Sequence, residues 1–285
     1  MDRWARWLLE RRHGGDEDEL ERLLPKLGEV RDRVIANAEI NAGDVVLDVG
    51  TGNGLIAFGA LEQVGPTGRV IFSDISTDLL DECSRLATEL GALDRCEFVE
   101  APADDLPFDD ESVDVVTTRS VLIYLMEKEP AFREFHRVLR PGGRLSIFEP
   151  INRFGHEENR RRYYGLDVGP VRPLADKIMA RWKQPQEHPL LNFDERDLFR
   201  WAQEAGFAQI RMDYSAEIDV TEWASSADAF LHSSGNPLDS TPEEEMLEAL
   251  DPAERAEFET YIRKAIASRP QIQRRLAKTY LRAVK

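Results

Sequence analysis

An α/β fold with a doubly wound, mostly parallel sheet is predicted by three observations on the sequence. Short apolar runs alternate with helical patterns between residues 43 and 150. A glycine-rich turn follows the first of these runs, and an acidic residue ends the second. Strands that alternate with helices pair in parallel through right-handed crossovers, so a ligand is expected at the carboxyl ends of the strands.

Five strands and the helices between them form the clearest part of the pattern. Ser76 is suited to begin a helix whose apolar residues recur at helical spacing up to Gly91. A later helix carries Phe132 and Val138 on one face and is expected to end at the turn over residues 141–143. The expected strands cover residues 45–49, 69–74, 96–99, 113–117 and 144–148.

Outside this core the pattern changes three times. Residues 1–40 are charged and helical. Residues 152–190 are irregular and precede a helix at 194–205 and a strand at 207–214. About 60 further residues contain a Glu-rich helix and lead to a last apolar run at 279–284. Since no internal repeat or long linker occurs, we expect insertions in one domain rather than two independent domains.

The composition excludes some classes of partner. The 285 residues include 37 Lys and Arg against 54 Asp and Glu, a formal net charge of -17. This acidic surplus opposes binding driven by phosphate charge, so we expect no nucleic acid and no membrane among the partners. The first 20 residues lack an apolar signal core, and we expect a cytoplasmic protein. Cys83 and Cys96 lack the spacing of a disulfide framework or metal site, so both should pack and no metal is expected.

The strongest chemical signal is the segment DVGTGNG at residues 48–54, between the first strand and a helix. Glycines there permit a tight turn and a close approach of ligand to backbone. Because Leu55 and Ile56 follow, the Lys-Ser/Thr ending of a phosphate-binding P-loop is missing. Leu55 also occupies the position of the third glycine in a dinucleotide fingerprint, which weakens both phosphate interpretations.

A second signal is Asp74, which ends the second strand about 20 residues after the glycine turn. A carboxylate at this position can accept hydrogen bonds from both ribose hydroxyls of an adenosine. Its alternative role is to cap the next helix, although Ser76 already suits that role.

Four segments together carry a resemblance to a known family. They are VVLDVGTGNG at 45–54, VIFSDIS at 70–76, ADDLPFDDESVDVV at 103–116 and FREFHRVLRPGGRLSIFEP at 132–150. In this order and at these spacings the chain resembles the Rossmann-like (class I) S-adenosylmethionine-dependent methyltransferases of the small-molecule type. The resemblance implies S-adenosylmethionine as the cofactor. It also implies a seven-stranded sheet with an antiparallel last strand, for which residues 279–284 are the candidate.

The resemblance assigns cofactor-binding roles to individual residues. Asp48 would order the glycine loop and the amino-acid end of the cofactor. Asp74 would hold the ribose, with Ile75 packed on the adenine. The residues that would approach the cofactor with their backbone are Gly50, Thr51, Gly52, Asn53, Arg119 and Ser120. For Arg119 a plain surface charge is the alternative.

The adenine contact departs from the family pattern. Ala103 and Asp104 lie where such enzymes contact the adenine ring. Many relatives have their adenine-contacting Asp where this chain has Pro102, so Asp104 or Asp105 would have to replace it.

No residue is a decisive general base. Methyl transfer is an in-line displacement, so positioning is the main contribution, and a base is needed only when the acceptor is protonated. The weak candidates are Tyr124, Glu149 and His156. Their alternative roles are a half-buried aromatic, a strand-end surface or capping group, and a loop histidine, respectively.

The same resemblance organises the whole chain. Residues 1–40 would form a helical lid, residues 41–150 the cofactor-binding core, and residues 151–285 the rest of the same domain. Insertions at about 152–190 and 217–275 would supply the acceptor pocket. The side chains considered for the lid or the pocket, with ordinary packing as their alternative, are Trp4, Trp7, Tyr163, Tyr164, Arg172, Trp182, Trp223, Phe230 and Asn236.

We therefore expect an enzyme, a monomer or homodimer, that methylates a small-molecule acceptor at a nitrogen, oxygen or carbon nucleophile. One alternative is an NAD(P)-dependent oxidoreductase, which Leu55 and the lack of a Tyr-x-x-x-Lys pair after the fourth strand oppose. The other is a methyltransferase-like protein that binds the cofactor without turnover.

Overall fold

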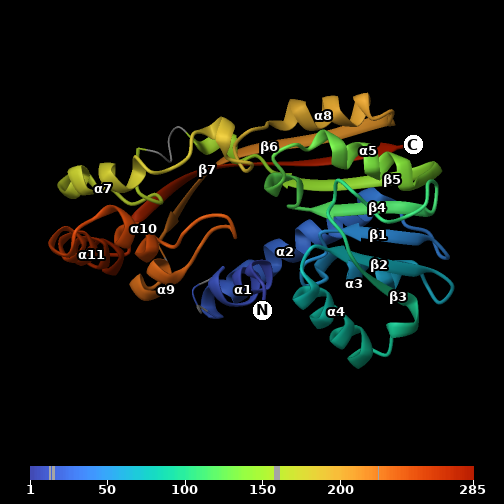
Figure 1. Cartoon of the computed structure of the whole chain (residues 1–285), viewed down its shortest axis with the longest axis horizontal. Helices are drawn as coiled ribbons and strands as arrows, with labels where there is room; N and C mark the ends of the chain where they lie inside the picture. Colours follow the sequence, from blue (N-terminus) through green and yellow to red (C-terminus); the bar gives the residue numbers. More distant parts are fainter. Residues whose placement is uncertain (13, 15–16, 157–160, 224) are drawn as a thin grey trace.

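The computed structural model describes residues 1–285 except 13, 15–16, 157–160 and 224. A seven-stranded sheet in the order β3-β2-β1-β4-β5-β7-β6 lies at its centre (Figure 1). Strands β1 to β5 pair in parallel, and β7 is antiparallel to both of its neighbours. The strands are β1 (Val45–Val49), β2 (Arg69–Asp74), β3 (Cys96–Glu100), β4 (Val113–Arg119), β5 (Leu139–Pro150), β6 (Ala208–Glu222) and β7 (Gln271–Val284). The predicted sheet and its antiparallel strand at 279–284 are confirmed.

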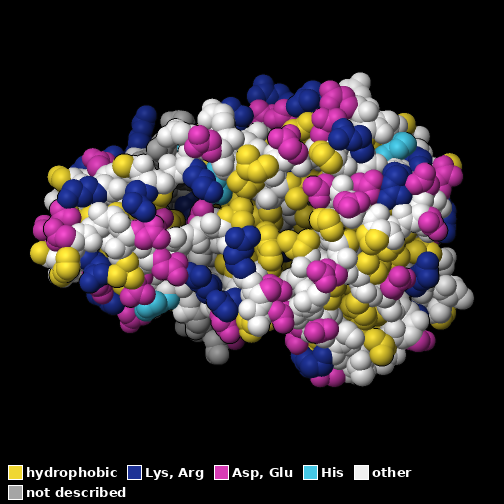
Figure 2. Space-filling model, in the orientation of Figure 1, with side chains coloured by type: hydrophobic (Ala, Val, Ile, Leu, Met, Phe, Trp, Pro, Cys, Tyr) yellow, Lys and Arg dark blue, Asp and Glu magenta, His cyan; other side chains and the backbone are white. Residues whose placement is uncertain are grey.

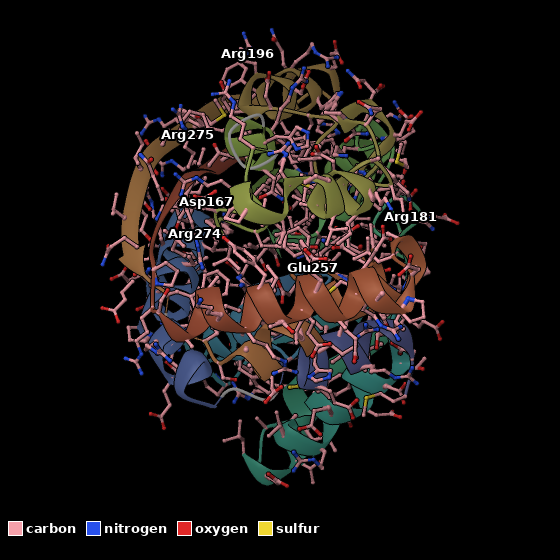
Figure 3. All side chains as sticks on the ribbon, turned by 90° about the vertical axis from the view of Figure 1, so that its left-hand side faces the viewer. Asp167, Arg181, Arg196, Glu257, Arg274 and Arg275 are labelled. Carbon is pink, nitrogen blue, oxygen red and sulfur yellow. The ribbon has the colours of Figure 1, made fainter. Side chains whose placement is uncertain are left out.

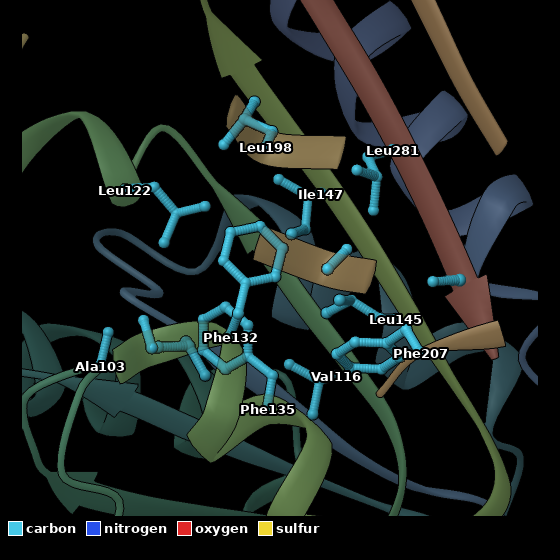
Figure 4. Packing of buried hydrophobic residues seen from close by; sticks show 14 of the residues in the cluster. Ala103, Val116, Leu122, Phe132, Phe135, Leu145, Ile147, Leu198, Phe207 and Leu281 are labelled. Atoms are coloured by element: carbon cyan, nitrogen blue, oxygen red, sulfur yellow. The ribbon is translucent and has the colours of Figure 1, made fainter. Parts of the chain in front are cut away.

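Helices cover both faces of the sheet. Val46 of β1 joins a core beneath three helices on one face, while Leu47 and Val49 join the core on the other face. This division follows from the alternation of side chains along a strand. Figure 4 shows Phe132 and Phe135 packed on the second face. The helices are α2 (Glu17–Ala38), α3 (Leu55–Gln63) and α4 (Thr77–Glu89) on the first face, with α5 (Glu129–Val138) and α8 (Glu195–Glu204) on the second.

The antiparallel pair β6 and β7 extends beyond the carboxyl ends of the parallel strands. Pro150, the last residue of β5, pairs with Lys278 of β7. The pairing of β6 with β7 continues past this point to Glu222 opposite Gln271. Seven further residue pairs at about 3.3 Å per residue make an extension of roughly 23 Å. We call residues 216–222 and 271–277 the β6–β7 extension.

A helical lobe is attached to this extension and has its own core. We define the lobe as residues 163–182, 223 and 225–267. Its fully buried members include Tyr163, Phe258 and Ile262, and Ile272 of the extension packs with them. Figure 1 places the lobe to the left of the sheet, and Figure 3 looks onto it with α11 across its outer face. Its helices are α7 (Arg172–Met179), α9 (Ala227–His232), α10 (Pro242–Ala249) and α11 (Pro252–Ala267).

Four predicted features differ in the structure. β6 continues to residue 222 instead of 214, and β7 begins at 271 instead of 279, because the extension is largely exposed and lacks an apolar run. Residues 172–179 form a helix within a segment expected to be irregular, and it begins with a proline in its first turn. The expected turn at 141–143 lies within β5, next to a register shift against β4.

The first residues form two short helical pieces ahead of α2. They are α1 (Arg3–Arg6) and the π-helix η1 (Trp7–Arg11). We call residues 1–12 the N-terminal segment, and in Figure 1 it lies between the lobe and the sheet. Among the described residues, none of the helices combines the length and apolar character that crossing a membrane would require.

The separate core of the lobe leads to a prediction. Phe258 is fully buried there, so Phe258→Ala should remove about 3–5 kcal/mol of stability, whereas the same change at exposed Phe199 should cost less than about 1 kcal/mol. Hydrogen exchange should report the loss first in α7, α9, α10 and α11. Equal acceleration of exchange in β1 to β5 would contradict a separately packed lobe.

Candidate functional site

The glycine-rich loop lies between β1 and α3 at the carboxyl edge of the sheet. Gly50 has a φ of 65°, and a Cβ atom there would lie 2.2 Å from Cγ2 of Val121. Gly54 is the left-handed N-cap of α3, with a φ of 81°. A Cβ atom at Gly54 would lie 2.5 Å from the ring of Phe58. Both positions therefore require glycine for conformation and for space.

Two buried side chains, Asp48 and Cys83, lie next to the glycine loop. The hydroxyl of Thr117 donates to the Asp48 carboxylate at 2.7 Å, and burial raises the pKa of Asp48 to about 6. The thiol of Cys83 donates to the carbonyl of Gly52 at 3.3 Å. Burial raises the pKa of this thiol to about 12, so Cys83 stays protonated and has the packing role predicted for it.

Asp74 joins the end of β2 to the glycine loop. Its Oδ2 accepts from the backbone N–H of Gly52 at 2.8 Å, and its Oδ1 accepts from Ser76 N–H at 2.9 Å. Ser76 itself caps α4 by accepting from Leu79 N–H, as predicted. Burial raises the pKa of Asp74. Each carboxylate oxygen retains a lone pair for a further donor, which is what two ribose hydroxyls would need.

The N-terminal segment lies directly on this corner. Ser76 Oγ donates to the Asp2 carboxylate at 2.6 Å, and the Asp2 backbone N–H contacts the carboxylate of Asp78. Leu8 reaches the loop itself, with its Cδ2 3.4 Å from where a Cβ of Gly52 would be. The approach to the glycine loop is therefore covered by residues far away in the sequence.

The same segment also reaches the lobe. The rings of Trp4 and Trp7 lie 5.1 and 6.3 Å from the ring of Tyr124, in edge-to-face geometry. Trp7 Nε1 donates to the carbonyl of Ser234 at 2.8 Å, and Ser234 N–H donates to the carbonyl of Arg11 at 3.0 Å. The N-terminal segment thus connects the glycine loop to the loop after α9.

The residues expected at the adenine lie together at the ends of β2 and β3. Ala101 N–H donates to the carbonyl of Asp74 at 3.0 Å, which brings the two chain segments side by side. Ile75 is 45% exposed and presents an open apolar side chain. Ala103 is buried and Asp104 is exposed. An Ile75 side chain that is open to solvent is suited to lie against a flat ring.

The remaining predicted backbone contacts occupy the same edge. Thr51 N–H donates to the carbonyl of Ser73 at 2.9 Å, while Asn53 is exposed at the loop tip. Ser120 has a φ of 56°, and its N–H donates to the carbonyl of Phe148 at 2.9 Å. The loop after β4 is thus fixed against β5.

Glu149 is fully buried at the end of β5. Its Oε1 accepts from the N–H groups of Val121 and Leu122 at 2.9 and 2.8 Å, and its Oε2 accepts from Ile123 N–H at 3.4 Å. The strand-end surface interpretation was wrong, because water does not reach this carboxyl group, whereas the capping interpretation is confirmed. Burial raises the pKa of Glu149 to about 7.

The other base candidates and Arg119 have different environments. Tyr124 is half-buried, and burial raises its pKa further above the usual tyrosine value, so the phenol stays neutral near pH 7. His156 directly follows the short helix over residues 152–155. Arg119 is not a plain surface charge, because its Nε is buried and has no acceptor among the described residues.

Most of the predicted pocket side chains pack elsewhere. Asn236 donates to Asp239, and Arg172 pairs with Asp176 on the outside of the lobe. Tyr164 is 39% exposed, and its hydroxyl donates to Glu245 at 2.9 Å. The aromatics that belong to the lobe core or pack directly against it are Tyr163, Trp182, Trp223 and Phe230.

Two residues near the site and one in the lobe escaped the sequence analysis. Leu8 and Arg12 are four positions apart in a helical stretch, and this spacing is the signal that places them on the same side. Glu245 accepts from Tyr163, Tyr164 and Trp182, but nothing in the sequence separates it from the glutamates next to it.

Known proteins resemble this chain in sequence. The family profile described as "Methyltransferase domain" matches residues 47–147. A ubiquinone/menaquinone biosynthesis C-methyltransferase UbiE from Francisella tularensis subsp. novicida is 38% identical over 117 residues, 41% of this chain and 47% of that protein. The UbiE of Pseudomonas putida is 33% identical over 177 residues, 60% of this chain and 68% of that protein. The chain belongs to the class I S-adenosylmethionine-dependent methyltransferases.

Solved structures agree with the fold of this methyltransferase. YcgJ from Bacillus subtilis superimposes with a TM-score of 0.56 at 17% identity, covering 90% of this chain and 97% of YcgJ. The sequence match spans only about half (47%) of the Francisella relative, so it concerns the core more than the whole protein. Family membership leaves no support for the NAD(P)-dependent alternative.

S-adenosylmethionine is the cofactor of the family, and the residues of this methyltransferase fit it. The glycine loop lets a ligand come close to its backbone. The Asp74 carboxylate has two oxygens, and each can accept one further hydrogen bond. The buried Asp48 carboxylate suits an ammonium group at the amino-acid end.

The raised pKa of Glu149 predicts a pH dependence of stability. Below pH 4.5 the carboxyl is protonated in both states, and above about pH 7 it is ionised in both. Between these values only the unfolded chain releases the proton, so the free energy of unfolding should fall as pH rises, by on the order of 3 kcal/mol. Urea unfolding between pH 4 and 8 should show this slope flattened in Glu149→Gln.

Glu100→Gln is the control, since Glu100 ends β3 as Glu149 lies next to the end of β5, but Glu100 is exposed. Its pH profile should follow the wild type. A Glu149→Gln profile as steep as the wild type would mean that another group causes the slope.

Proposed function

We propose that the chain transfers the methyl group of S-adenosylmethionine to a small-molecule acceptor and releases S-adenosylhomocysteine. One observation carries the proposal: Asp48, the glycine loop and Asp74 meet at the carboxyl edge of the sheet, where the β6–β7 extension holds the lobe. Parallel sheets bind their ligands at this edge.

The shape and charge of the region favour a small acceptor. Figure 2 shows hydrophobic side chains gathered between the lobe and the sheet, where the surface is hollowed. The acceptor belongs between the sheet edge and the lobe, an enclosed position that suits a small molecule. The net charge of -17 opposes nucleic acid and anionic membranes, and the proposal includes a cytoplasmic monomer or homodimer.

Each predicted site residue has a role in the proposal. Asp48 holds the amino-acid end of the cofactor, Asp74 its ribose, and Ile75 its adenine. Ala103 and Asp104 border the adenine from the segment after β3. The residues that approach with their backbone are Gly50, Thr51, Gly52, Asn53, Arg119 and Ser120.

Positioning is the main contribution of the chain to the reaction. The cofactor supplies a methyl group activated on a sulfonium, and the acceptor must be held in line with the bond that breaks. Glu149 directs its oxygens at backbone N–H groups, and Tyr124 has a pKa too high for a base near pH 7. His156 is the remaining candidate for proton removal. The relatives are named C-methyltransferases, but the match covers 41% of this chain, so the acceptor atom stays nitrogen, oxygen or carbon.

The N-terminal segment acts as a lid in this proposal. Leu8 lies on Gly52, and Asp2 accepts from Ser76 next to the ribose position. A segment in this place closes the site to water once the cofactor is bound. Its contact with the loop at Ser234 couples the lid to the lobe.

Transfer of a labelled methyl group tests the proposed activity. Purified protein with methyl-labelled S-adenosylmethionine should label a fraction of small metabolites, with protein and RNA fractions as controls. Label found only in RNA would overturn the substrate class. Binding of the cofactor with no label in any fraction would instead support the non-catalytic alternative.

Removal of the Asp74 carboxylate tests the cofactor site. Asp74→Ala should weaken S-adenosylhomocysteine binding by about 1–3 kcal/mol, because two ribose hydroxyls lose a charged acceptor. Calorimetry measures the change, and exposed Asp81 on α4 provides the control Asp81→Ala. Unchanged affinity in Asp74→Ala would remove Asp74 from the site, and tight NAD binding by the wild type would overturn the cofactor assignment.

A further inference from the structure

Two arginines at the mouth of the proposed site lack a counter-ion. Neither Arg12 nor Arg119 makes an ion pair or a side-chain hydrogen bond within the part of the chain that the structure describes, although both are largely withdrawn from solvent. Nε of Arg119 is fully buried without an acceptor. In an acidic protein with many carboxylates available, this absence of partners distinguishes the pair from most other arginines that are partly buried.

The two arginines belong to chain segments that meet at Tyr124. Arg119 ends β4, and Arg12 follows η1 with its guanidinium 5.3 Å from the centre of the Trp7 ring. Burial lowers the pKa of Arg119 to about 10, and the neighbouring charge of Arg12 lowers it too. Tyr124, whose ring meets that of Trp7, lies within the electrostatic reach of both arginines. Arg12, Arg119 and Tyr124 therefore lie where the N-terminal segment meets the end of β4.

Two like charges held together away from water are unfavourable unless an anion joins them. The guanidinium fork is suited to bind a carboxylate through two parallel hydrogen bonds. Glu149 lies near Arg119, but its oxygens are directed at the backbone of residues 121–123 and form no ion pair with either arginine. The missing counter-ion is therefore expected from a ligand.

The position of the pair favours the acceptor over the cofactor as the source of that anion. Arg119 lies opposite Phe148 of β5, whereas the pairing of β4 with β1 ends one residue earlier, at Thr118. Arg12 lies over the ring of Trp7, whose Nε1 donates to the carbonyl of Ser234 in the loop after α9, so Arg12 lies on the side of the lobe. In the proposed function this is the acceptor side.

We propose that Arg12 and Arg119 bind a carboxylate group of the methyl acceptor. The inference rests on the proposed function and narrows it to acidic small molecules. It assigns to the Arg119 side chain a role separate from the backbone contact that the family resemblance implies. It also gives the N-terminal segment a direct part in acceptor recognition, because Arg12 belongs to that segment.

The test compares benzoate with benzamide, a neutral molecule of the same shape, by calorimetry with and without S-adenosylhomocysteine. The wild type should bind benzoate at least about tenfold more tightly than benzamide, since charged hydrogen bonds to a carboxylate are lost with the amide. Arg12→Gln and Arg119→Gln should each remove most of this preference, because the guanidinium group that pairs with the carboxylate is lost. Arg119→Lys, which keeps the charge, should retain part of the preference.

Arg6→Gln is the matched control, because Arg6 lies in the same segment and is exposed. Melting curves show whether each variant is folded, and Arg12→Gln remains informative if Arg119→Gln is not. Equal or undetectable binding of benzoate and benzamide by the wild type overturns the proposal. Loss of S-adenosylhomocysteine binding with an unchanged benzoate preference also overturns it, and assigns the arginines to the cofactor carboxylate. Failure of the proposed function is seen separately, as a wild type that does not bind S-adenosylhomocysteine.

Discussion

The carboxylate of Asp74 is the group on which the geometry of the site depends. It holds the backbone of Gly52 with one oxygen and that of Ser76 with the other, so β2 fixes both the glycine loop and the start of α4. Ser76 extends the connection to Asp2 and hence to the N-terminal segment. A single buried acid thereby sets the relative positions of parts far apart in the sequence, and its burial makes those bonds stronger than they would be in water.

Glu149 has the corresponding position on the other side of β1 and β4. By accepting from successive N–H groups after residue 120 it fixes the turn that brings Val121 against Gly50. Tyr124 follows at the end of the same turn. The two sides of the proposed site are thus each positioned by a strand-end carboxylate that bonds to backbone. These hydrogen bonds hold the loops at the edge of the sheet.

The sequence predicted the sheet well and the surroundings of the site poorly. Strands β1, β2, β4 and β5 were predictable because each contains a short, buried apolar run, and the glycine loop because the turn itself requires its residues. The β6–β7 extension was missed because its exposed strands carry mixed polar residues, as Glu217 to Asp219 show. The role proposed for Arg12 could not be predicted either. The lack of a counter-ion depends on segments distant in the sequence, which only the folded chain brings together.

The β6–β7 extension sets the distance between the lobe and the sheet edge. Side chains alternate between its two faces, and Ile272 must reach the lobe core from one of them. A change of length by one residue in each strand would turn that face outward, whereas a change by two would keep it and move the lobe by about 7 Å. The depth of the space beneath the lobe can therefore change only in discrete steps. In the proposed function, the extension acts as a spacer that sets this depth.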